Sequence, residues 1–243
     1  MTRQFSYCGA PPMPDQLWAS WNLDPMLIVG MAAAAMMMWR ASRSPPEGRW
    51  AMIAGFGALL IAFVSPLCAL TNALFAARTV HHLLLVLVAA PLFALSLAPG
   101  SDAGRSPVAA LFASTVLLWF WHWPPAYSAA LSSTLIYWTM QASLLISATC
   151  FWWGVLLSPR EPLPALLAIL GSMAQMGLLG AVLTFAPTPF YAEHIVSTAA
   201  FGLSPRQDQQ LAGLIMWVPA MLPYLLLGGL VARRAWRTAL SPA

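Results

Sequence analysis

The sequence predicts an all-α, multi-pass membrane protein whose helices form one bundle. Two features of its composition indicate this class. Hydrophobic residues make up 60% of the chain, with a mean hydropathy of +0.74, and only 7% of residues are charged, where a soluble domain carries about 25%. The apolar stretches are roughly 16 to 25 residues long, which is typical of membrane-spanning helices and not of alternating barrel strands. A bilayer offers no water to the backbone, so the spans must be helical.

Seven spans are expected, joined by short linkers into one compact bundle. In order they run over residues 25–39, 50–70, 80–98, 107–121, 135–157, 163–186 and 209–232. The first reaches spanning length only if residues 18–24 form an interfacial extension. We therefore expect a short periplasmic tail over residues 1–24, a seven-span domain over residues 25–233 and a cytoplasmic tail over residues 234–243.

Arginine distribution predicts the orientation, because cytoplasmic loops of membrane proteins carry the excess of basic residues. One set of linkers and the C-terminal tail hold Arg40, Arg43, Arg49, Arg105, Arg160, Arg233, Arg234 and Arg237; the other side holds Arg3, Arg78 and Arg206. The heavier side should face the cytoplasm, which places the N-terminus outside and the C-terminus inside. The net charge of +4 therefore reflects topology and does not indicate nucleic-acid binding.

The three cysteines, Cys8, Cys68 and Cys150, are too few and too scattered to predict a disulfide framework or a C-x-x-C redox motif. Cys150 is expected to be a buried, inert thiol. The same is favoured for Cys68, with a thiolate ligand as the alternative. The first fourteen residues lack the apolar core of a signal peptide, so a short translocated tail is expected.

All four histidines are expected at the outer edge of the membrane. His81 and His82 open the third span, and His122 closes the fourth, because Pro124 and Pro125 cannot continue its helix. Consecutive antiparallel spans pack with axes about 8–10 Å apart, so His122 should approach the His81–His82 pair. Imidazoles gathered at one boundary indicate a metal or redox site that faces one compartment.

A competing interpretation applies to each histidine taken singly. His, Trp and Tyr side chains at a membrane boundary often do no more than keep one end in water. The expected proximity of three histidines favours a site over this interpretation. His194 lies in a later loop beside Tyr191 and Glu193, and a solvated surface position is favoured for it.

Two charged residues are expected near the histidines. Arg78 lies four residues before His82, hence on the same helix face. Its charge would keep the imidazole neutral, which suits metal ligation, but would repel a cation unless a carboxylate pairs with it. Asp208, at the start of the seventh span, is the candidate partner. It is equally typical of a first-turn carboxylate that stabilises a helix start.

Methionines and aromatic residues offer weaker signals. Thioethers are soft ligands for Cu(I), and Met173, Met176 and Met216 fall on the last two spans, although core packing is the favoured role for membrane methionines. Several aromatic residues fall near the outer interface: Trp121, Trp123, Tyr127, Tyr137 and Trp138. An aromatic belt that sets depth in the membrane is favoured for them, with a docking surface for a partner as the alternative.

Four segments carry a resemblance to a known family. The stretch over residues 80–92, which begins Val-His-His-Leu, the stretch 119–127 with Trp-His-Trp-Pro-Pro, the Phe-Trp-Trp at 151–153, and the stretch 202–217 with Ser-Pro-Arg-Gln-Asp-Gln-Gln occur in that order. Together they resemble the CtaG-type cytochrome c oxidase assembly factors. The resemblance extends from about residue 59 to residue 233 and therefore covers most of the chain.

The resemblance implies a seven-helix protein of the bacterial inner (plasma) membrane that is needed to mature haem–copper oxidase and is not an enzyme. Its expected cargo is copper, as Cu(I), handled at the outer face, with oxidase subunits and a periplasmic copper donor as partners. The polar signature residues carried over by position are His82, His122, Asp208, Gln209 and Met216. Two positions depart from the pattern: many relatives carry a histidine at Arg78, and a Glu-His pair at Met140 and Gln141. The site would then have fewer nitrogen ligands, completed by His81 or a methionine, or would hold no tightly bound metal.

Three alternatives stay open. His82 and His122 on neighbouring spans are also able to ligate haem, which would make the chain an electron-transfer protein. A metal-free scaffold for an oxidase subunit is the second alternative. A transporter is the third, because Pro91, Pro219 and Pro223 are able to break helices around a pathway, although charges at the midplane are missing from the sequence. Zinc is disfavoured, since no closed set of four ligands is visible.

Overall fold

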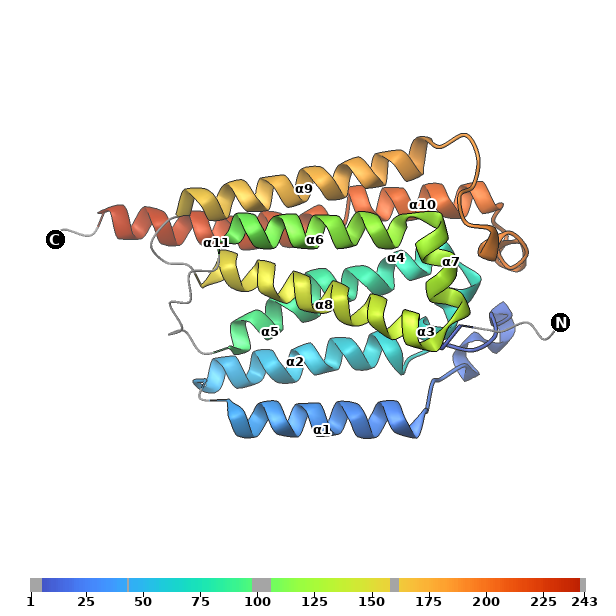
Figure 1. Cartoon of the computed structure of the whole chain (residues 1–243), viewed down its shortest axis with the longest axis horizontal. Coiled ribbons are helices and arrows are strands. Elements are labelled where there is room, and N and C mark those ends of the chain that lie inside the picture. Colours follow the sequence, from blue (N-terminus) through green and yellow to red (C-terminus); the bar gives the residue numbers. More distant parts are fainter. Residues whose placement is uncertain (1–5, 43, 98–105, 158–161, 241–243) are drawn as a thin grey trace.

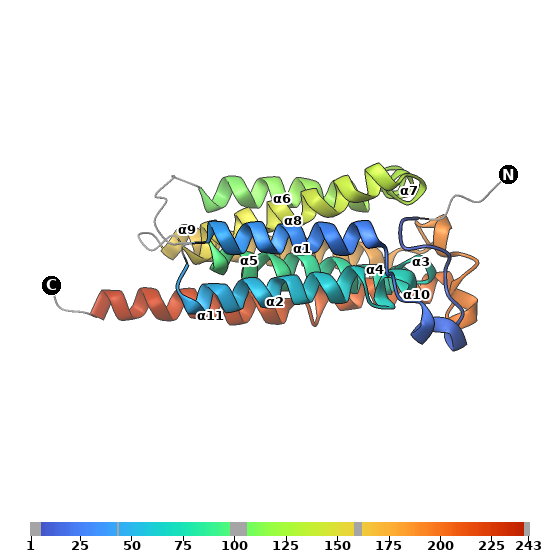
Figure 2. The same cartoon turned by 90° about the horizontal axis from the view of Figure 1, so that it is seen from below.

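The computed structural model describes residues 6–42, 44–97, 106–157 and 162–240, and every regular element in these ranges is helical. In chain order the elements are η1 (Pro14–Ala19), α1 (Pro25–Ala41), α2 (Pro46–Phe63), α3 (Leu67–Ala73), α4 (Phe75–Leu83), the π-helical η2 (Leu84–Ala89), α5 (Ala90–Ser96), α6 (Pro107–His122), α7 (Pro124–Ser132), α8 (Thr134–Leu156), α9 (Pro162–Phe185), η3 (Ala192–His194), η4 (Thr198–Phe201), α10 (Pro205–Trp217) and α11 (Met221–Leu240). The long helices lie side by side in one bundle in two perpendicular views, with η1 and the end of α11 at opposite ends of it (Figure 1, Figure 2).

Several of these helices suit a membrane. Four are long and apolar enough to cross one: the continuous α4–η2–α5, α8, α9, and the α10–α11 pair. The α2–α3 pair, bent by 44°, adds a fifth if it counts as one span. Two further apolar helices, α1 and α6, are shorter, with 17 and 16 residues. The prediction of a multi-pass, all-α membrane protein is confirmed in this coarser form.

The α4–η2–α5 helix runs through the middle of the bundle and contacts α2, α8 and α10. Its π-helical stretch ends next to Pro91, which has no N–H to donate five residues back to the carbonyl of Val86. The indole N–H of Trp152 on α8 donates to that carbonyl instead, at 2.8 Å. The proline is therefore accommodated without a break, and the helix stays continuous from Phe75 to Ser96.

The structure corrects three of the predicted boundaries. The second span is interrupted after Phe63, because Pro66 disfavours helical backbone in the residue before it. The helix that carries His81 and His82 begins at Phe75, five residues earlier than predicted. Residues 124–132 form α7, which lies across the end of the bundle (Figure 1). Pro124 and Pro125 do end α6 at His122, but proline is favoured in the first turn of a helix and so starts a new one.

The prediction about the cysteines was wrong, because Cys8 and Cys68 form a disulfide with their Cα atoms 5.3 Å apart. The N-terminal tail folds back over the bundle end where α3 begins, which brings together residues 60 positions apart in sequence. Asn72 reinforces this contact: it accepts from the Ser6 hydroxyl at 2.6 Å and donates to the carbonyl of Gly9 at 2.6 Å. Cys150 is a free, half-buried thiol.

Helices α9 and α10 pack closely through small residues. A Cβ atom built on Gly180 would lie 2.8 Å from the carbonyl oxygen of Gly213, so only glycine permits this approach. Two glutamines of α10 then reach the last turn of α9: Gln209 donates to the carbonyl of Leu183, and Gln210 to that of Thr184, both at 3.2 Å. This contact fixes the start of α10, and with it Asp208, against the rest of the bundle.

Candidate functional site

The four histidines lie at one end of the bundle, which we call the histidine end. His81 and His82 are on α4, His122 is the last residue of α6, and His194 ends η3. The ring centroids of His81 and His82 are 5.7 Å apart, and those of His82 and His122 are 6.3 Å apart. The predicted approach of His122 to the pair is therefore observed, and His82 lies between the other two rings.

The hydrogen bond of His122 fixes which of its nitrogens is free to bind a ligand. Its Nδ1 lies 2.7 Å from the carbonyl oxygen of Leu118, one turn earlier on α6. A carbonyl only accepts, so Nδ1 carries the proton and Nε2 has the lone pair. A histidine held in this way by a backbone carbonyl is the usual arrangement for a metal ligand.

His82 and His81 have nitrogens without a protein partner. Within the described part of the chain, no hydrogen-bond partner contacts Nε2 of His82 or either ring nitrogen of His81, although all three atoms are buried. The side chain of Gln141 and the backbone of Ala62 lie close to the His81 ring. Buried polar atoms are nearly always paired, so the Nε2 of His82 is the atom that requires an explanation such as a bound ion or water. His81 is 0% exposed and packs edge-on against the ring of Phe63 at 4.8 Å.

Arg78 lies one turn before His82 and is 1% exposed. Its NH2 donates to the side-chain oxygen of Asn72 at 2.8 Å and its Nε to the carbonyl of Thr71 at 3.3 Å. The guanidinium also lies over the rings of Tyr127 and Tyr137, with its carbon 5.7 and 5.9 Å from their centroids. The faces of these rings offset part of its charge.

Of the two interpretations left open for Asp208, the structure supports the carboxylate at a helix start and not the partner of Arg78. Its carboxylate accepts from the backbone N–H of Phe75 at 2.7 Å and from that of Ala76 at 3.0 Å. The side chain thus caps α4 from another helix, where a negative charge meets the positive end of the helix dipole. Because α4 carries Arg78, His81 and His82, Asp208 positions all three.

The aromatic-belt interpretation fails for most of the predicted set. Tyr127 and Tyr137 are 1% and 0% exposed, and Trp121 is also buried, with its indole N–H donating to the Ser143 hydroxyl at 2.8 Å. Trp123 is exposed, as a belt residue would be. Sequence alone gives no signal for this burial, because it arises where α7 lies across the bundle end.

His194 is buried, so the solvated surface position expected for it was wrong. Its Nε2 lies 2.6 Å from the hydroxyl of Tyr127. Burial, followed by the positive charge of Arg78, lowers the pKa of His194 to about 3, so the ring stays neutral. Burial likewise raises the pKa of the Tyr127 hydroxyl, which stays protonated.

The last two predicted site residues lie elsewhere. Met216 is buried in the hydrophobic core with Met176 and Leu179, and it packs near Gly180 of α9. Gln209 accepts from the backbone N–H of Phe190 at 2.7 Å while it donates to α9. The geometry thus gives Met216 a packing role and Gln209 the task of anchoring the loop that carries Tyr191 and His194.

A two-ligand ion is the most that the described histidines accommodate. No group of three or more His, Cys, Asp or Glu side chains in residues 6–42, 44–97, 106–157 and 162–240 is arranged to hold a metal. Two imidazole nitrogens each about 2.0 Å from one ion would place the ring centroids roughly 6 Å apart, which matches the 6.3 Å between His82 and His122. The separation of the two ring centroids is thus the one that a two-coordinate ion requires, whereas no tetrahedral zinc site is arranged among the described side chains.

Comparison with known proteins decides the family. The family model described as "Cytochrome c oxidase caa3 assembly factor (Caa3_CtaG)" matches residues 31–238. The chain belongs to this family of assembly factors. No curated protein and no solved structure matches it.

The matched region contains every histidine of this assembly factor, together with Arg78, Asp208 and Met216. It excludes the N-terminal tail, and with it Cys8 and the two tail residues that bind Asn72, Ser6 and Gly9. Within the matched region, Arg78 and Gln141 both lie beside His81. The family name is that of an assembly factor and not of an enzyme.

Proposed function

We propose that this assembly factor holds a copper ion as cargo between His82 and His122 and delivers it to cytochrome c oxidase during assembly. The observation that carries the proposal is the pairing of these two buried rings at 6.3 Å, with the lone pair of His122 fixed on Nε2. His82 contributes a buried Nε2 that has no partner among the described residues.

Copper fits this pair better than the other metals that imidazole binds. Imidazole nitrogens suit Cu, Zn, Fe and Ni, but structural zinc takes four ligands, and two is the number offered here. A Cu(I) ion carries a single charge and accepts few ligands, so the nearby Arg78 repels it less than it would repel a divalent ion. His81, whose ring lies 5.7 Å from that of His82, is close enough to replace one of the two ligands during loading or release, and it adds no third ligand to the present arrangement.

We also propose that the histidine end faces the periplasm of a bacterial plasma membrane and that α1 and α6 cross it as well, for seven spans. Two independent features support this orientation. The described arginines Arg40, Arg49, Arg233, Arg234 and Arg237 lie at the opposite end, which suits a cytoplasmic face; Arg3, Arg43, Arg105 and Arg160 are outside the described residues. The Cys8–Cys68 disulfide lies at the histidine end, and disulfides persist in oxidising compartments.

Cysteine labelling in whole cells tests the orientation. In a background with Cys150→Ser, a cysteine at the exposed position Val196 should react with a membrane-impermeant maleimide from outside. A cysteine at Arg237 should react only after the membrane is opened. The reverse pattern would place the histidine end in the cytoplasm and remove the case for periplasmic copper.

Metal analysis and an absorption spectrum of the purified protein test the cargo. The proposal predicts about one copper per chain after loading with Cu(I) and no Soret band. A haem spectrum would favour the electron-transfer alternative, with the same two histidines as ligands. Loading with neither copper nor haem would leave the assembly factor as a scaffold for an oxidase subunit.

A further inference from the structure

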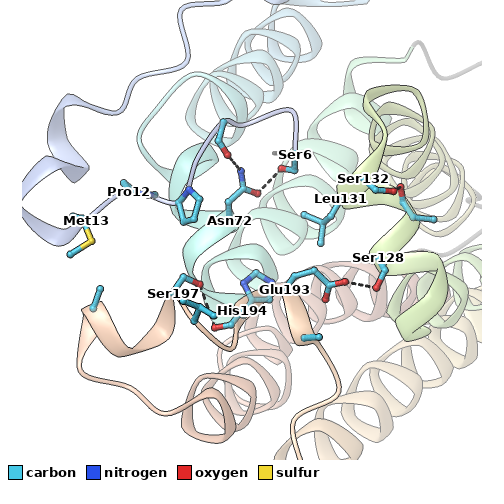
Figure 3. A pocket seen from close by; sticks show the side chains of 16 residues that line it. Ser6, Pro12, Met13, Asn72, Ser128, Leu131, Ser132, Glu193, His194 and Ser197 are labelled. Carbon is cyan, nitrogen blue, oxygen red and sulfur yellow. Dashed lines mark hydrogen bonds between the residues drawn. The ribbon is translucent and has the colours of Figure 1, made fainter. Parts of the chain in front are cut away.

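A large pocket opens at the histidine end, between the N-terminal tail, α7 and the η3–η4 loop (Figure 3). Its volume is about 820 Å³, within the range of about 300–1,000 Å³ that is typical of ligand pockets. Three segments far apart in the sequence form its walls, so the pocket exists only in the folded chain. A pocket that the fold forms at the same end as the histidine pair is a candidate binding site.

The tail forms one wall, and specific contacts hold it there. Gly9, Pro11 and Met13 line the pocket, and the Cys8–Cys68 disulfide ties this stretch to the start of α3. Asn72 lies in the wall between them and binds both Ser6 and Gly9 through its amide (Figure 3). The wall is therefore fixed by a covalent bond and two hydrogen bonds.

The lining combines hydrogen-bonding groups with small apolar surfaces and one charge. The hydroxyls of Ser128, Ser132 and Ser197 already donate within the protein, so their oxygens are left to accept from the N–H groups of a peptide backbone. Among the described residues that line the pocket, Glu193 carries the only charge, since His194 stays neutral, and it accepts a hydrogen bond from the Ser128 hydroxyl. A segment with a cationic side chain would pair with this carboxylate.

A thin aromatic layer separates the pocket from the histidine pair. His194 lines the pocket and contacts the hydroxyl of Tyr127 below it. The ring of Phe75 lies 6.0 Å from that of His194 on one side and 6.5 Å from that of His122 on the other. Tyr191 donates from its hydroxyl to the carbonyl of His122 at 2.8 Å. An occupant of the pocket would therefore press on the residues that cover the candidate copper ligands.

We propose that this pocket is the docking site for an extended segment of the oxidase subunit under assembly, a segment that carries a Lys or Arg side chain opposite Glu193. This proposal rests on the proposed function in one respect: the role in oxidase assembly is the reason for a partner to dock at the histidine end. The docking site concerns the protein partner, whereas the proposed function concerns the copper ion, so docking and copper binding are tested separately.

Filling the pocket with a large side chain tests the proposal. Ala200 lines the pocket and is exposed, while its neighbour Ala199 in η4 is equally exposed but does not line it. Ala200→Trp should lower the amount of mature oxidase roughly tenfold or more, as the loss of a docking hot spot would. Ala199→Trp is the matched control and should leave oxidase maturation unchanged. Ser132→Trp, from the opposite wall, should reproduce the effect of Ala200→Trp.

The copper content of the purified variants distinguishes a docking site for a protein segment from a path by which the ion reaches the histidines. The purified Ala200→Trp and Ser132→Trp proteins should take up Cu(I) as the unaltered protein does, and both should be present in the membrane in normal amounts. Glu193→Lys should lower maturation and keep copper uptake. Normal maturation in both tryptophan variants would overturn the proposal. So would loss of copper uptake in them, because the pocket would then be the path of the ion. If maturation fails in the variants and the unaltered protein binds no copper, docking stands and the copper proposal falls.

Discussion

Replacing Asp208 with alanine should destabilise the assembly factor more than replacing any other helix cap. The carboxylate accepts two backbone N–H groups at the start of α4 and is 1% exposed. A hydrogen bond to a charged group contributes about 1.5–3 kcal/mol, and the alanine variant leaves both buried donors unpaired. We therefore expect a loss of roughly 3–5 kcal/mol, a large part of the 5–15 kcal/mol that stabilises a typical domain. Thermal unfolding in detergent measures this effect.

Asp24 provides the matched control. It caps α1 at the same end of the bundle by accepting from the N–H of Met26 at 2.9 Å in an exposed contact, and it also accepts from the Tyr7 hydroxyl. Asp24→Ala should cost about 2 kcal/mol, the sum of an ordinary cap and one further hydrogen bond, which is less than the cost of Asp208→Ala. Asp208→Asn keeps an acceptor and should recover part of the stability. Equal unfolding temperatures for Asp208→Ala and Asp24→Ala would contradict the role of Asp208 in holding α4.

Replacing His82 or His122 with alanine should abolish most copper binding and oxidase maturation while the protein stays in the membrane. Both rings are needed, because one imidazole alone leaves the ion with a single protein ligand. The double variant should be little worse than either single one, since groups that act on one ion behave as a unit. Copper content of the purified variants and oxidase activity of the cells are the measurements.

His194→Ala separates ligation from packing. The solvated position predicted for His194 would have made this substitution mild, but the ring is buried against Tyr127. Loss of the His194 ring should lower stability by about 1–3 kcal/mol, the cost of leaving a buried polar group unpaired, and leave the copper content unchanged.

The prediction for His82 and His122 has its own contrary outcome. Normal oxidase maturation in both the His82→Ala and His122→Ala variants would show that His82 and His122 are packing side chains.

Local sequence signals were sufficient where neighbouring helices alone decide the outcome. The proximity of His122 to His82 follows from antiparallel packing of consecutive spans, and the end of α6 follows from two prolines. The ring separations confirm that proximity; metal binding by these rings stays a prediction. The family resemblance, carried by the same segments, is confirmed over residues 31–238.

Contacts between distant segments account for the errors. Asp208 was correctly recognised as a possible helix-start carboxylate, yet the helix that it caps begins 133 residues earlier in the chain. Cys8 pairs with Cys68 only because the tail folds back over the bundle end. His194 is buried because α7 supplies Tyr127 above the core. Periodicity and composition carry no information about which loop covers which helix end, so none of these pairings was predictable from sequence alone.

X-ray absorption at the copper edge of the Cu(I)-loaded protein is the most direct test of the central claim, that His82 and His122 hold copper. The account predicts a first shell of about two nitrogen ligands at roughly 2 Å, with the imidazole signature, and its loss in His122→Ala. A shell dominated by sulfur, or an unchanged spectrum in both the His82→Ala and His122→Ala variants, would contradict it.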